Sequence, residues 1–444
     1  MSTSRLEIDL GAIERNFSQV RRIVGPSVGI CAVLKQDAYG LGAPRIARRA
    51  LACGAKSVAV YNLDEARTVF EAAPEATILV LMPVAGVERT DPLYRCAAAG
   101  RLHVVVHDSE QLVALNDGAL RLGVTIPVHV QVDTGLSRGG ERTEDSVRII
   151  ERIGLLSRVR LAGVMTHFAS PGDDAAFTAE QWRLFTEVVK TARGVARGEL
   201  DVHASNSCGT FRSRGYHGTM VRVGECLYGM VGGAVWGEGR GLAGMEFAAE
   251  ARAMEPALRW TSTIAHVQEI PAGWPVGYGS TWRAPRRSDG RPTRIALVPV
   301  GYADGYPRSL GGDARGGPGV VGFTGRRWGR RGAMADPDGP GGRVFFAPVV
   351  GRVSMDQITV DATDVPEEYL AVGREGSALA GAEVELIGAD PASPTHLPAL
   401  ASAGGTIAHE LLCRLSSRLD RVYRHTGLAT AGAGAAARVA AAPM

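Results

Sequence analysis

Lysine is scarce in this sequence, and its scarcity singles out one amine as a candidate for chemistry. Of the 49 basic side chains only Lys35, Lys56 and Lys190 are lysines, which leaves 46 arginines. Lys35 directly follows the apolar run 28–34, which has the length of a buried strand. Lys56 precedes the next such run, at the opposite end of a parallel strand, and Lys190 falls within a long helical stretch. Lys35 is therefore the candidate nucleophile, with an ordinary surface lysine in a loop as the alternative.

Other polar groups also follow strand-like runs, and together they suit a phosphorylated cofactor. They are a histidine, two arginines and Gly/Ser-rich turns, namely Arg138, His167, Asn206-Ser207 and Arg222-Val-Gly224. The free N–H groups of such turns can hold a phosphate. An amine beside them is what a pyridoxal phosphate enzyme requires, because the amine forms a Schiff base with the aldehyde of the cofactor. The alternatives are a satisfied core histidine for His167 and a surface arginine for Arg138.

These groups must be positioned by parallel strands. Apolar runs alternate with amphipathic stretches at eight places: 28–34, 57–61, 77–82, 102–107, 126–132, 159–168, 200–204 and 219–223. The runs are continuously apolar, which is typical of parallel strands covered on both faces. Asn62, with Glu65 three positions later, predicts a capping box at the start of one helix. Eight β/α units predict an α/β fold with a closed (β/α)8 barrel of the TIM type, whose active site gathers at the C-terminal strand ends.

After about residue 246 the pattern indicates a mostly β domain. Strand-like runs occur at 260–269, 294–299, 344–349, 357–361 and 384–388, and one helical stretch is expected at 406–423. The Arg/Gly-rich segments 283–294 and 323–343 are expected to be solvated insertions, with a polyanion-binding loop at 325–331 as the alternative. We expect three parts: a barrel over 1–245, whose first ten residues pack with the second domain, a β domain over 246–426 and a disordered tail over 427–444.

Composition excludes several classes of protein. With 45% hydrophobic and 21% charged residues, the 444-residue chain fits neither disorder nor a membrane bundle. A net charge of +3 is too small to predict nucleic-acid binding. The six cysteines form no C-x-x-C pair, and the N-terminus carries charges where a signal peptide would be apolar. We therefore predict a cytoplasmic protein with reduced thiols, no metal site, no nucleic-acid partner and no membrane association.

A series of motifs runs from near the N-terminus to about residue 423. They are Ala32-Val-Leu-Lys-Gln-Asp-Ala-Tyr-Gly-Leu-Gly, Val132-Asp-Thr-Gly-Leu-Ser-Arg, Thr166-His-Phe, His203-x-x-Asn-Ser, Val221-Arg-Val-Gly, Val276-Gly-Tyr-Gly-Ser-Thr-Trp, Gly301-Tyr-Ala-Asp-Gly-Tyr-Pro-Arg and Gly351-Arg-Val-Ser-Met-Asp-Gln. In content and order the series resembles the alanine racemases, which are fold-type III pyridoxal phosphate enzymes. The resemblance implies a barrel plus a β domain, pyridoxal 5′-phosphate as cofactor and a small amino-acid substrate. It also implies a head-to-tail homodimer in which each β domain completes the partner's site.

The resemblance further implies two racemising bases. Lys35 would be the Schiff-base lysine and one base, and Tyr278, reaching in from the second subunit, would be the other. A proton must leave one face of the α-carbon and return to the opposite one, which a single fixed base does poorly. A tyrosine with a pKa near ~10 needs a neighbour that stabilises its phenolate, and the resemblance assigns this to His167, held by Arg222. Arg222 would face the pyridine nitrogen, and its retained proton would make the ring a weaker electron sink.

The remaining site residues implied by the resemblance bind rather than react. Arg138 would hold the substrate carboxylate with its planar fork. Tyr302 and Met355 would crowd the opening, which favours a small side chain such as alanine or serine. The cofactor's phosphate would be held by Tyr39, Asn206, Ser207, the backbone N–H groups near Gly224, and His409. The predicted activity is the conversion of L-alanine to D-alanine, for D-alanine biosynthesis.

Several features depart from the family's pattern. Gln131 stands where many members have a carbamylated lysine that orients the carboxylate-binding arginine, so an amide oxygen or an anion in that space would replace it. Glu225 lies beside the phosphate turn and would repel a phosphate, so we predict that it points away. His409 replaces a phosphate-binding tyrosine, and the insertions 283–294 and 323–343 are unusually long. Two alternatives stay open: a racemase or other pyridoxal phosphate reaction on different amino acids, and a cofactor-binding protein without turnover.

Overall fold

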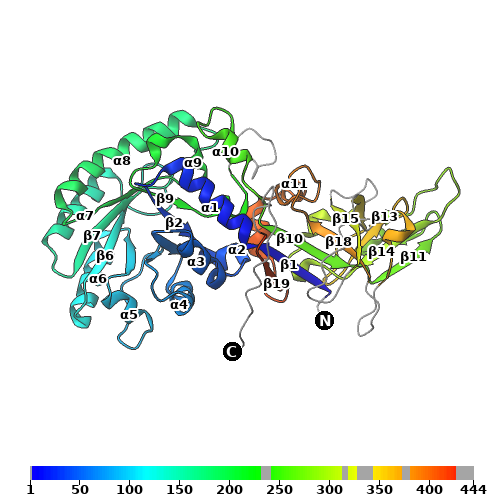
Figure 1. Ribbon diagram of the computed structural model, residues 1–444, viewed down its shortest axis with the longest axis horizontal. Helices are drawn as coiled ribbons and strands as arrows, with labels where there is room; N and C mark the ends of the chain where they lie inside the picture. Colours follow the sequence, from blue (N-terminus) through cyan, green and yellow to red (C-terminus); the bar gives the residue numbers. More distant parts are fainter. Residues whose placement is uncertain (1–2, 232–241, 313–318, 328–343, 373–380, 427–444) are drawn as a thin grey trace, which may run out of the picture.

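The chain forms an eight-stranded barrel and a nine-stranded sheet that lie next to each other along the long axis of the molecule (Figure 1). The computed structural model describes residues 3–231, 242–312, 319–327, 344–372 and 381–426. The expected tail over 427–444 and residues 328–343 of the second expected insertion lie outside the described residues. Within the described ranges, no helix combines the length and the apolar character needed to cross a membrane.

The barrel strands are those predicted from the eight apolar runs. Their order is β8-β7-β6-β5-β4-β3-β2-β9, and neighbouring strands are parallel. The Thr219 N–H donates to the Val202 carbonyl at 2.9 Å, which brings the two outer strands of this order together and nearly closes the barrel. The strands are β2 (Gly29–Val33), β3 (Ser57–Val60), β4 (Ile78–Val80), β5 (Leu102–Val106), β6 (Ile126–Gln131), β7 (Val159–Met165), β8 (Asp201–His203) and β9 (Met220–Val223). The fold-class prediction is confirmed.

Helices alternate with these strands and cover the outside of the barrel (Figure 1). They are α1 (Leu10–Val24), α3 (Ala43–Ala52), α4 (Leu63–Ala72), α5 (Leu93–Ala98), α6 (Ser109–Leu122), α7 (Thr143–Leu155), α8 (Ala175–Val195), α9 (Ser207–Arg212) and α10 (Ala248–Arg252). The predicted capping box forms only in part. Asn62 accepts the Glu65 N–H at 2.9 Å, but the Glu65 carboxylate accepts the Tyr61 and Gln36 N–H groups instead of that of Asn62.

The nine-stranded sheet has the order β11-β14-β17-β16-β15-β18-β10-β1-β19. Its strands are β1 (Ser4–Asp9), β10 (Leu258–Thr263), β11 (His266–Ile270), β14 (Thr293–Val298), β15 (Val320–Arg327), β16 (Phe345–Val350), β17 (Ile358–Asp361), β18 (Ala382–Ile387) and β19 (Asp420–Arg424). Beside it, β12 (Pro275–Val276) and β13 (Trp282–Arg283) form a two-stranded ribbon, and α11 (Leu397–Ala403) precedes α12 (Ala408–Arg414). The mostly β character of this region is confirmed.

Three predictions for this region were wrong in detail. The run 260–269 forms two strands, β10 and β11. The Ile264 N–H donates to a carbonyl of β18 and the next N–H, of Ala265, donates to a carbonyl of β14, so the chain passes from one part of the sheet to another between the two strands. The helix expected at 406–423 ends at Arg414, since Ser416 N–H bonds to the Asp304 carbonyl and the chain then pairs as β19 with β1. Residues 320–327 form strand β15 inside the sheet, although most of that stretch was assigned to an insertion.

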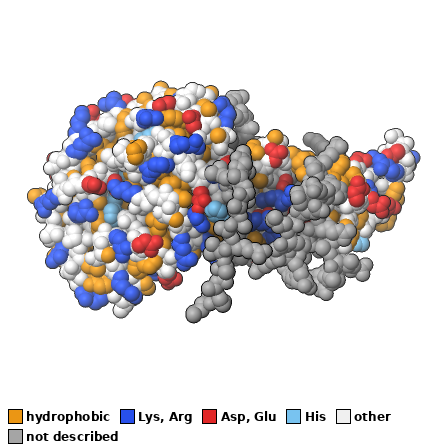
Figure 2. Space-filling model, in the orientation of Figure 1, with side chains coloured by type: hydrophobic (Ala, Val, Ile, Leu, Met, Phe, Trp, Pro, Cys, Tyr) orange, Lys and Arg blue, Asp and Glu red, His pale blue; other side chains and the backbone are white. Residues whose placement is uncertain are grey.

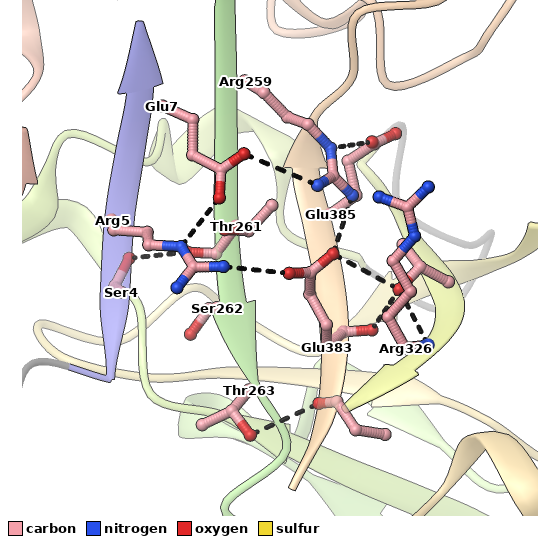
Figure 3. Close-up of polar contacts among 12 residues, drawn as sticks. Ser4, Arg5, Glu7, Arg259, Thr261, Ser262, Thr263, Arg326, Glu383 and Glu385 are labelled. Carbon is pink, nitrogen blue, oxygen red and sulfur yellow. Dashed lines mark hydrogen bonds and ion pairs between the residues drawn. The ribbon is translucent and has the colours of Figure 1, made fainter. Parts of the chain in front are cut away.

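The N-terminal strand β1 lies between β10 and β19, so the chain starts in the sheet and then enters the barrel through α1. A network of ion pairs crosses the strands on one face of the sheet, as Figure 3 shows. Arg5 pairs with Glu7 at 2.8 Å and with Glu383 at 3.3 Å. Arg259 pairs with Glu383 and Glu385, each at 2.8 Å. The three carboxylates are buried, and their pairing compensates the cost of removing them from water.

The segment 283–294 lies at the surface and is tied to a neighbouring loop by ion pairs. Arg287 pairs with Asp364 at 2.6 Å, and Arg291 pairs with Asp289 at 2.8 Å. On the face of the barrel shown in Figure 2, basic and acidic side chains are interspersed. This mixture agrees with the small net charge of the chain.

Candidate active site

Lys35 begins a backbone turn of unusual conformation at the C-terminal end of β2. The turn, α2 (Lys35–Gly40), contains four consecutive residues in the left-handed region, with φ values of 53°, 52°, 55° and 61° for Gln36, Asp37, Ala38 and Tyr39. None of the four is glycine, and each residue held in this region costs roughly 1–2 kcal/mol. Strain of this kind persists only where surrounding contacts impose it, and it is concentrated at functional sites.

Contacts from both domains hold this turn. On one side the Glu65 carboxylate of α4 accepts the Gln36 N–H at 2.9 Å. On the other, Arg421 Nε donates to the Gly40 carbonyl at 2.8 Å, and Tyr423 Oη donates to the Leu41 carbonyl at 2.9 Å. Arg421 and Tyr423 belong to β19, so the sheet domain helps to fix the segment that carries Lys35.

The environment of Lys35 favours a neutral amine. Burial lowers its pKa, and the nearby positive charge of Arg138 lowers it further. The other lysines lie elsewhere, as expected: Lys56 pairs with Asp201 at 2.6 Å at the N-terminal end of the barrel, and Lys190 pairs with Glu187 at 2.9 Å on α8. Because the neutral amine is the nucleophile, Lys35 is suited to attack a carbonyl group.

Arg222 on β9 is buried at the same end of the barrel. Its Nη1 donates to the His203 carbonyl at 2.6 Å, and its Nη2 donates to the carbonyls of Thr166 and Ala204 at 2.8 and 3.2 Å. Burial lowers the pKa of Arg222 to about 10. The three carbonyls fix the guanidinium in position without neutralising its charge.

A chain of histidines extends from Arg222 into the barrel interior. Arg222 Nη1 lies 3.0 Å from His203 Nδ1, His203 Nε2 lies 2.8 Å from His129 Nδ1, and His129 Nε2 lies 2.8 Å from His103 Nδ1. Arg222 can only donate, so each histidine must accept at Nδ1 and carry its proton on Nε2. Burial keeps the pKa of His129 and His203 well below the ordinary value, so these rings are neutral.

His167 contacts the same guanidinium from the end of β7. Its Nδ1 lies 3.3 Å from Arg222 Nη2, which makes Nδ1 an acceptor and leaves Nε2–H as a donor. Burial, with the charges of Arg222 and Arg138, holds the pKa of His167 well below its ordinary value. The Asn206 Nδ2 group lies 3.4 Å from His167 Nε2 but is itself a donor, and Asn206 Oδ1 caps α9 by accepting the Gly209 N–H at 2.9 Å, so Asn206 does not accept the Nε2–H. His167 is therefore a neutral hydrogen-bond donor.

The turn after β9 forms a compact cradle of N–H groups. The Ser207 hydroxyl oxygen accepts the N–H of Gly224 at 3.1 Å and that of Cys226 at 3.4 Å. A Cβ at position 224 would lie 2.3 Å from Tyr39 Oη, so only glycine allows the tyrosine to approach this backbone. The hydroxyl of Tyr228, which packs edge-on against Tyr39, is buried without a partner among the described residues. Both N–H groups donate to Ser207 Oγ, so the Ser207 O–H is the donor that remains for an anion.

The two unusual residues beside this cradle contact each other. Glu225 follows the cradle glycine, and its Oε2 lies 2.6 Å from His409 Nε2 on α12. The ring of His409 also packs against Tyr39, with 5.8 Å between the ring centroids. The structure therefore places the Glu225 carboxylate against an imidazole; whether it points away from a bound phosphate stays a prediction.

Arg138 is exposed at the same rim, in the loop after β6. Its charge contributes to the lowered pKa of Lys35 and of His167, which places its guanidinium near both. Among the described residues, none forms a hydrogen bond or ion pair with this guanidinium. The Gln131 amide donates only to the Val132 carbonyl, at 3.4 Å. Gln131 does not hold Arg138, which is free to bind a carboxylate.

The structure does not bring Tyr278, Tyr302 and Met355 into this cluster within one chain. All three lie in the sheet domain, and their side chains are 71%, 42% and 54% exposed. Arg418 connects two of their loops by pairing with Asp304 at 2.7 Å and with Asp356 at 2.8 Å. Three large side chains at the surface of one domain suit contact with another chain.

Comparison with known proteins decides the family. The sequence profile described as alanine racemase, N-terminal domain, matches residues 8–231, and that described as alanine racemase, C-terminal domain, matches residues 257–335 and 339–423. The chain belongs to the alanine racemase family. It is 32% identical over 423 residues to the alanine racemase of Halothermothrix orenii, covering 94% of this chain and 96% of that protein.

Solved alanine racemase structures share the fold. That of Streptomyces coelicolor A3(2) has a TM-score of 0.73 at 28% identity and covers 95% of this chain and 98% of its own. The alanine racemase of Bartonella henselae, with covalently bound pyridoxal phosphate, has a TM-score of 0.72 at 25% identity and covers 96% of this chain and 100% of its own.

The motifs shared with alanine racemases contain the site residues of the barrel. The residues that hold these site residues in place were not predicted from sequence. His203 stood in a quoted motif without a role, and His103 and His129 were not considered, although histidines inside apolar strand runs were a usable signal. Arg421 and Glu65 could not be found from sequence, because they act on the Lys35 turn from distant elements.

Proposed function

We propose that this protein is an alanine racemase that interconverts L-alanine and D-alanine with pyridoxal 5′-phosphate. The observation that carries the proposal is the pairing of a neutral-prone amine, Lys35, with the Ser207 hydroxyl, which the N–H groups of Gly224 and Cys226 hold at the same end of the barrel. The amine suits the aldehyde of this cofactor and the hydroxyl can donate to its phosphate. Membership of the alanine racemase family supports the same activity.

The residues present fit the cofactor. Because position 224 carries no side chain, the Tyr39 hydroxyl reaches the backbone of the cradle, and the buried hydroxyl of Tyr228, whose ring packs against Tyr39, has no partner among the described residues. Tyr39 and Ser207 complete the polar surface, and Asn206 fixes the start of α9. When bound, pyridoxal phosphate supplies an aldehyde for Lys35 and a conjugated ring that stabilises negative charge on the α-carbon of the substrate.

Arg222 is assigned to the pyridine nitrogen. Its Nη1 and Nη2 groups donate to three carbonyls, so it presents a fixed guanidinium that keeps its proton in the buried site. This limits the electron withdrawal by the ring. With this guanidinium beside it, a bound cofactor ring would withdraw less charge from the α-carbon, which would favour return of a proton there and thus racemisation over transamination.

Two bases on opposite faces of the α-carbon perform the proton transfers. Lys35 is one. Tyr278 of the partner subunit is the other, as the resemblance to the alanine racemases implies, and its largely exposed side chain in the sheet domain is accessible to a second chain. Neutral His167 has an Nε2–H available, and this donor stabilises the phenolate of the partner's Tyr278. The active enzyme is therefore a homodimer with shared sites.

Substrate selection rests on Arg138, Tyr302 and Met355. The unpaired guanidinium of Arg138 holds the substrate carboxylate. The exposed side chains of Tyr302 and Met355, brought from the partner subunit together with its Tyr278, narrow the opening and favour a methyl-sized side chain.

The cysteines indicate the compartment in which the enzyme works. All six cysteines are free, which supports a reducing compartment, and we assign the enzyme to the cytoplasm and to D-alanine biosynthesis. The division into a barrel over 1–245, a β domain over 246–426 and a tail over 427–444 is part of this proposal.

The test is incubation of the purified protein with L-alanine in heavy water. The parent enzyme should exchange the α-proton for deuterium with inversion. Tyr278→Phe should still exchange the proton on the Lys35 face but should lose inversion by about a hundredfold or more, because one base is missing. Equal racemisation by Tyr278→Phe would refute the two-base assignment, and turnover only on bulky amino acids would remove alanine as the substrate.

A further inference from the structure

Part of the barrel interior is polar, although side chains inside such barrels are mostly branched and aliphatic. An apolar cluster fills only the other part, and it consists of Cys31, Ala59, Leu79, Val105, Met165 and Met220. Beside this cluster, His103, His129 and His203 form the histidine chain that leads to Arg222. Removing imidazole rings from water costs free energy that aliphatic side chains would not cost, so these rings are expected to serve a purpose other than filling space.

The backbone is adapted to the central ring of this chain, that of His129. Position 163 on the neighbouring strand β7 is glycine, and a Cβ there would lie 2.2 Å from His129 Nδ1. The register between β6 and β7 also shifts between Val128 and His129, so the strand pairing is irregular at this ring. Both ring nitrogens are used, each at 2.8 Å from the next histidine. An aliphatic side chain at this position could replace neither hydrogen bond.

The hydrogen bonds of the histidine chain all run in one direction, and tautomers maintain that direction. Burial lowers the pKa of His103 to about 4 and the pKa of His129 and of His203 well below the ordinary value, so all three rings are neutral. In a neutral imidazole one nitrogen donates and the other accepts, so the tautomer of each ring imposes that of the next. Because Arg222 can only donate, every ring accepts at Nδ1 and donates from Nε2.

The far end of the histidine chain favours the same direction. His103 and His129 line a cavity of about 110 Å³ at the N-terminal end of the barrel, together with Lys56 and Asp201. A backbone hydrogen bond with Gly100 opposes the effect of burial on the pKa of His103. An acceptor is the partner that stabilises a protonated ring, so His103 donates in this contact. The histidine chain thus has a donor-only group at one end and an acceptor at the other.

The orientation of Arg222 depends on this direction. Its Nη1 lies 3.0 Å from His203 Nδ1, while its Nε–H forms no hydrogen bond within the described part of the protein. If His203 carried its proton on Nδ1, two donors would face each other and the guanidinium would be displaced. The tautomer of His203 therefore decides whether Arg222 keeps the orientation seen in the structure.

We propose that His129 and His103 are positioning residues that hold His203 in the tautomer that accepts from Arg222, and thereby fix the guanidinium that faces the pyridine nitrogen of the cofactor. The inference rests on the proposed function, which assigns Arg222 to that nitrogen. A displaced guanidinium should increase transamination. In that side reaction alanine is oxidised to pyruvate, the aldehyde of the cofactor is reduced to an amine that keeps the amino group, and the α-proton goes to the cofactor's carbon instead of the α-carbon.

The experiment uses the full-length protein with two readouts. In the cofactor-free protein, NMR of isotope-labelled histidine nitrogens shows which nitrogen of His203 carries the proton, and the signal of His203 is assigned by its loss in His203→Gln. In the protein loaded with pyridoxal phosphate, the pyruvate formed per alanine racemised measures transamination. The first readout does not depend on catalysis.

The variants interrupt or preserve the histidine chain. His129→Leu can neither accept nor donate, whereas the amide of His129→Gln can accept from His203 and donate to His103. His103→Leu interrupts the chain one hydrogen bond farther from Arg222. The matched control is His217→Leu, since His217 is also a buried histidine, but its Nε2 lies 2.8 Å from the Thr210 carbonyl, away from the histidine chain.

In the parent, His203 should carry its proton on Nε2 alone. In His129→Leu that donor has no acceptor, and the cost of leaving it unpaired is similar to the gain from the hydrogen bond with Arg222, so a second tautomer with the proton on Nδ1 should appear. The pyruvate fraction should then rise by about threefold or more. His103→Leu should show the same two changes to a smaller extent. His129→Gln and His217→Leu should behave as the parent.

Three results would overturn the inference: a proton on Nδ1 of His203 in the parent, an unchanged pyruvate fraction in both His129→Leu and His103→Leu, or an equal rise in His217→Leu. If His129→Leu does not fold, His103→Leu decides, because His103 is only partly buried and borders the cavity. Failure of the proposed function has a different signature. There, borohydride reduction would leave no cofactor on Lys35 and the parent would not racemise L-alanine, whatever tautomer the cofactor-free protein shows.

Discussion

Glu65 supports Lys35, the lysine proposed to be catalytic, without belonging to the reacting groups, and its removal should impair the enzyme. Its two carboxylate oxygens accept the Gln36 N–H at 2.9 Å and the Tyr61 N–H at 2.7 Å. Gln36 is the first of the four left-handed residues that follow Lys35. In Glu65→Ala the N–H groups of Gln36 and Tyr61 lose their acceptor, and the turn loses its contact with α4.

The magnitude follows from the two hydrogen bonds and from the strain they oppose. A hydrogen bond to a charged acceptor contributes about 1.5–3 kcal/mol when sheltered, but both donors lie in exposed residues, where water can replace the carboxylate, so about 1–2 kcal/mol in total is a better value. The left-handed turn opposes this with roughly 1–2 kcal/mol for each of its residues. Loss of about 1–2 kcal/mol shifts the equilibrium of the turn roughly 5–30-fold toward conformations that misplace Lys35, so kcat/KM should fall by about tenfold.

The assay follows L-alanine racemisation by chiral detection, together with the absorbance of the lysine-bound cofactor and thermal unfolding. The matched control is Asp64→Ala. Asp64 lies in the same first turn of α4, but its side chain is 89% exposed and pairs only with Arg67 of that helix, a pair that contributes little. Glu65→Gln, which keeps one acceptor oxygen, should fall between Glu65→Ala and the parent. If Glu65→Ala racemises as fast as Asp64→Ala, the turn does not depend on this carboxylate.

Other predictions concern the buried supports and the pH profile. Arg222→Lys cannot reach all three carbonyls, so the free energy of unfolding should fall by about 2–4 kcal/mol in urea denaturation, and an unchanged value would contradict the assigned bonds. His129→Leu leaves the donor of His203 unpaired and should cost about 2 kcal/mol, whereas equal stability would show that the histidine chain is not continuous. Because burial and the charge of Arg138 lower the pKa of Lys35, the amine is neutral at a lower pH than a free lysine. Arg138→Gln removes one cause and should raise the pH midpoint of cofactor capture; a lower midpoint would contradict it.

The barrel could be predicted from sequence because burial on both faces leaves a strong local signal. Each parallel strand is a short apolar run, and the sequence between runs carries the amphipathic period of a helix. The sheet domain gave a weaker signal. Residues 406–423 have a helical pattern, yet contacts of Ser416 and Arg418 with the loops at Asp304 and Asp356 end the helix and release Asp420–Arg424 to pair with β1. Tertiary contacts overrode local propensity there.

In the candidate site, too, features set by local sequence could be predicted and features set by long-range contacts could not. Lys35, Arg222 and Ser207 could be predicted because parallel strands deliver their C-terminal ends to one rim, whatever the rest of the chain does. The contacts that give these groups their properties come from long-range packing. Tyr423 reaches the Lys35 turn from β19, more than 380 residues along the chain, as its hydroxyl donates to Leu41. Because β19 is an edge strand held by β1, the N-terminal strand connects the sheet to both α1 and the Lys35 turn. The sheet domain therefore supports the lysine of its own chain, and in the proposed mechanism it also presents Tyr278 to another chain, so a change that loosens β19 should affect both proposed bases.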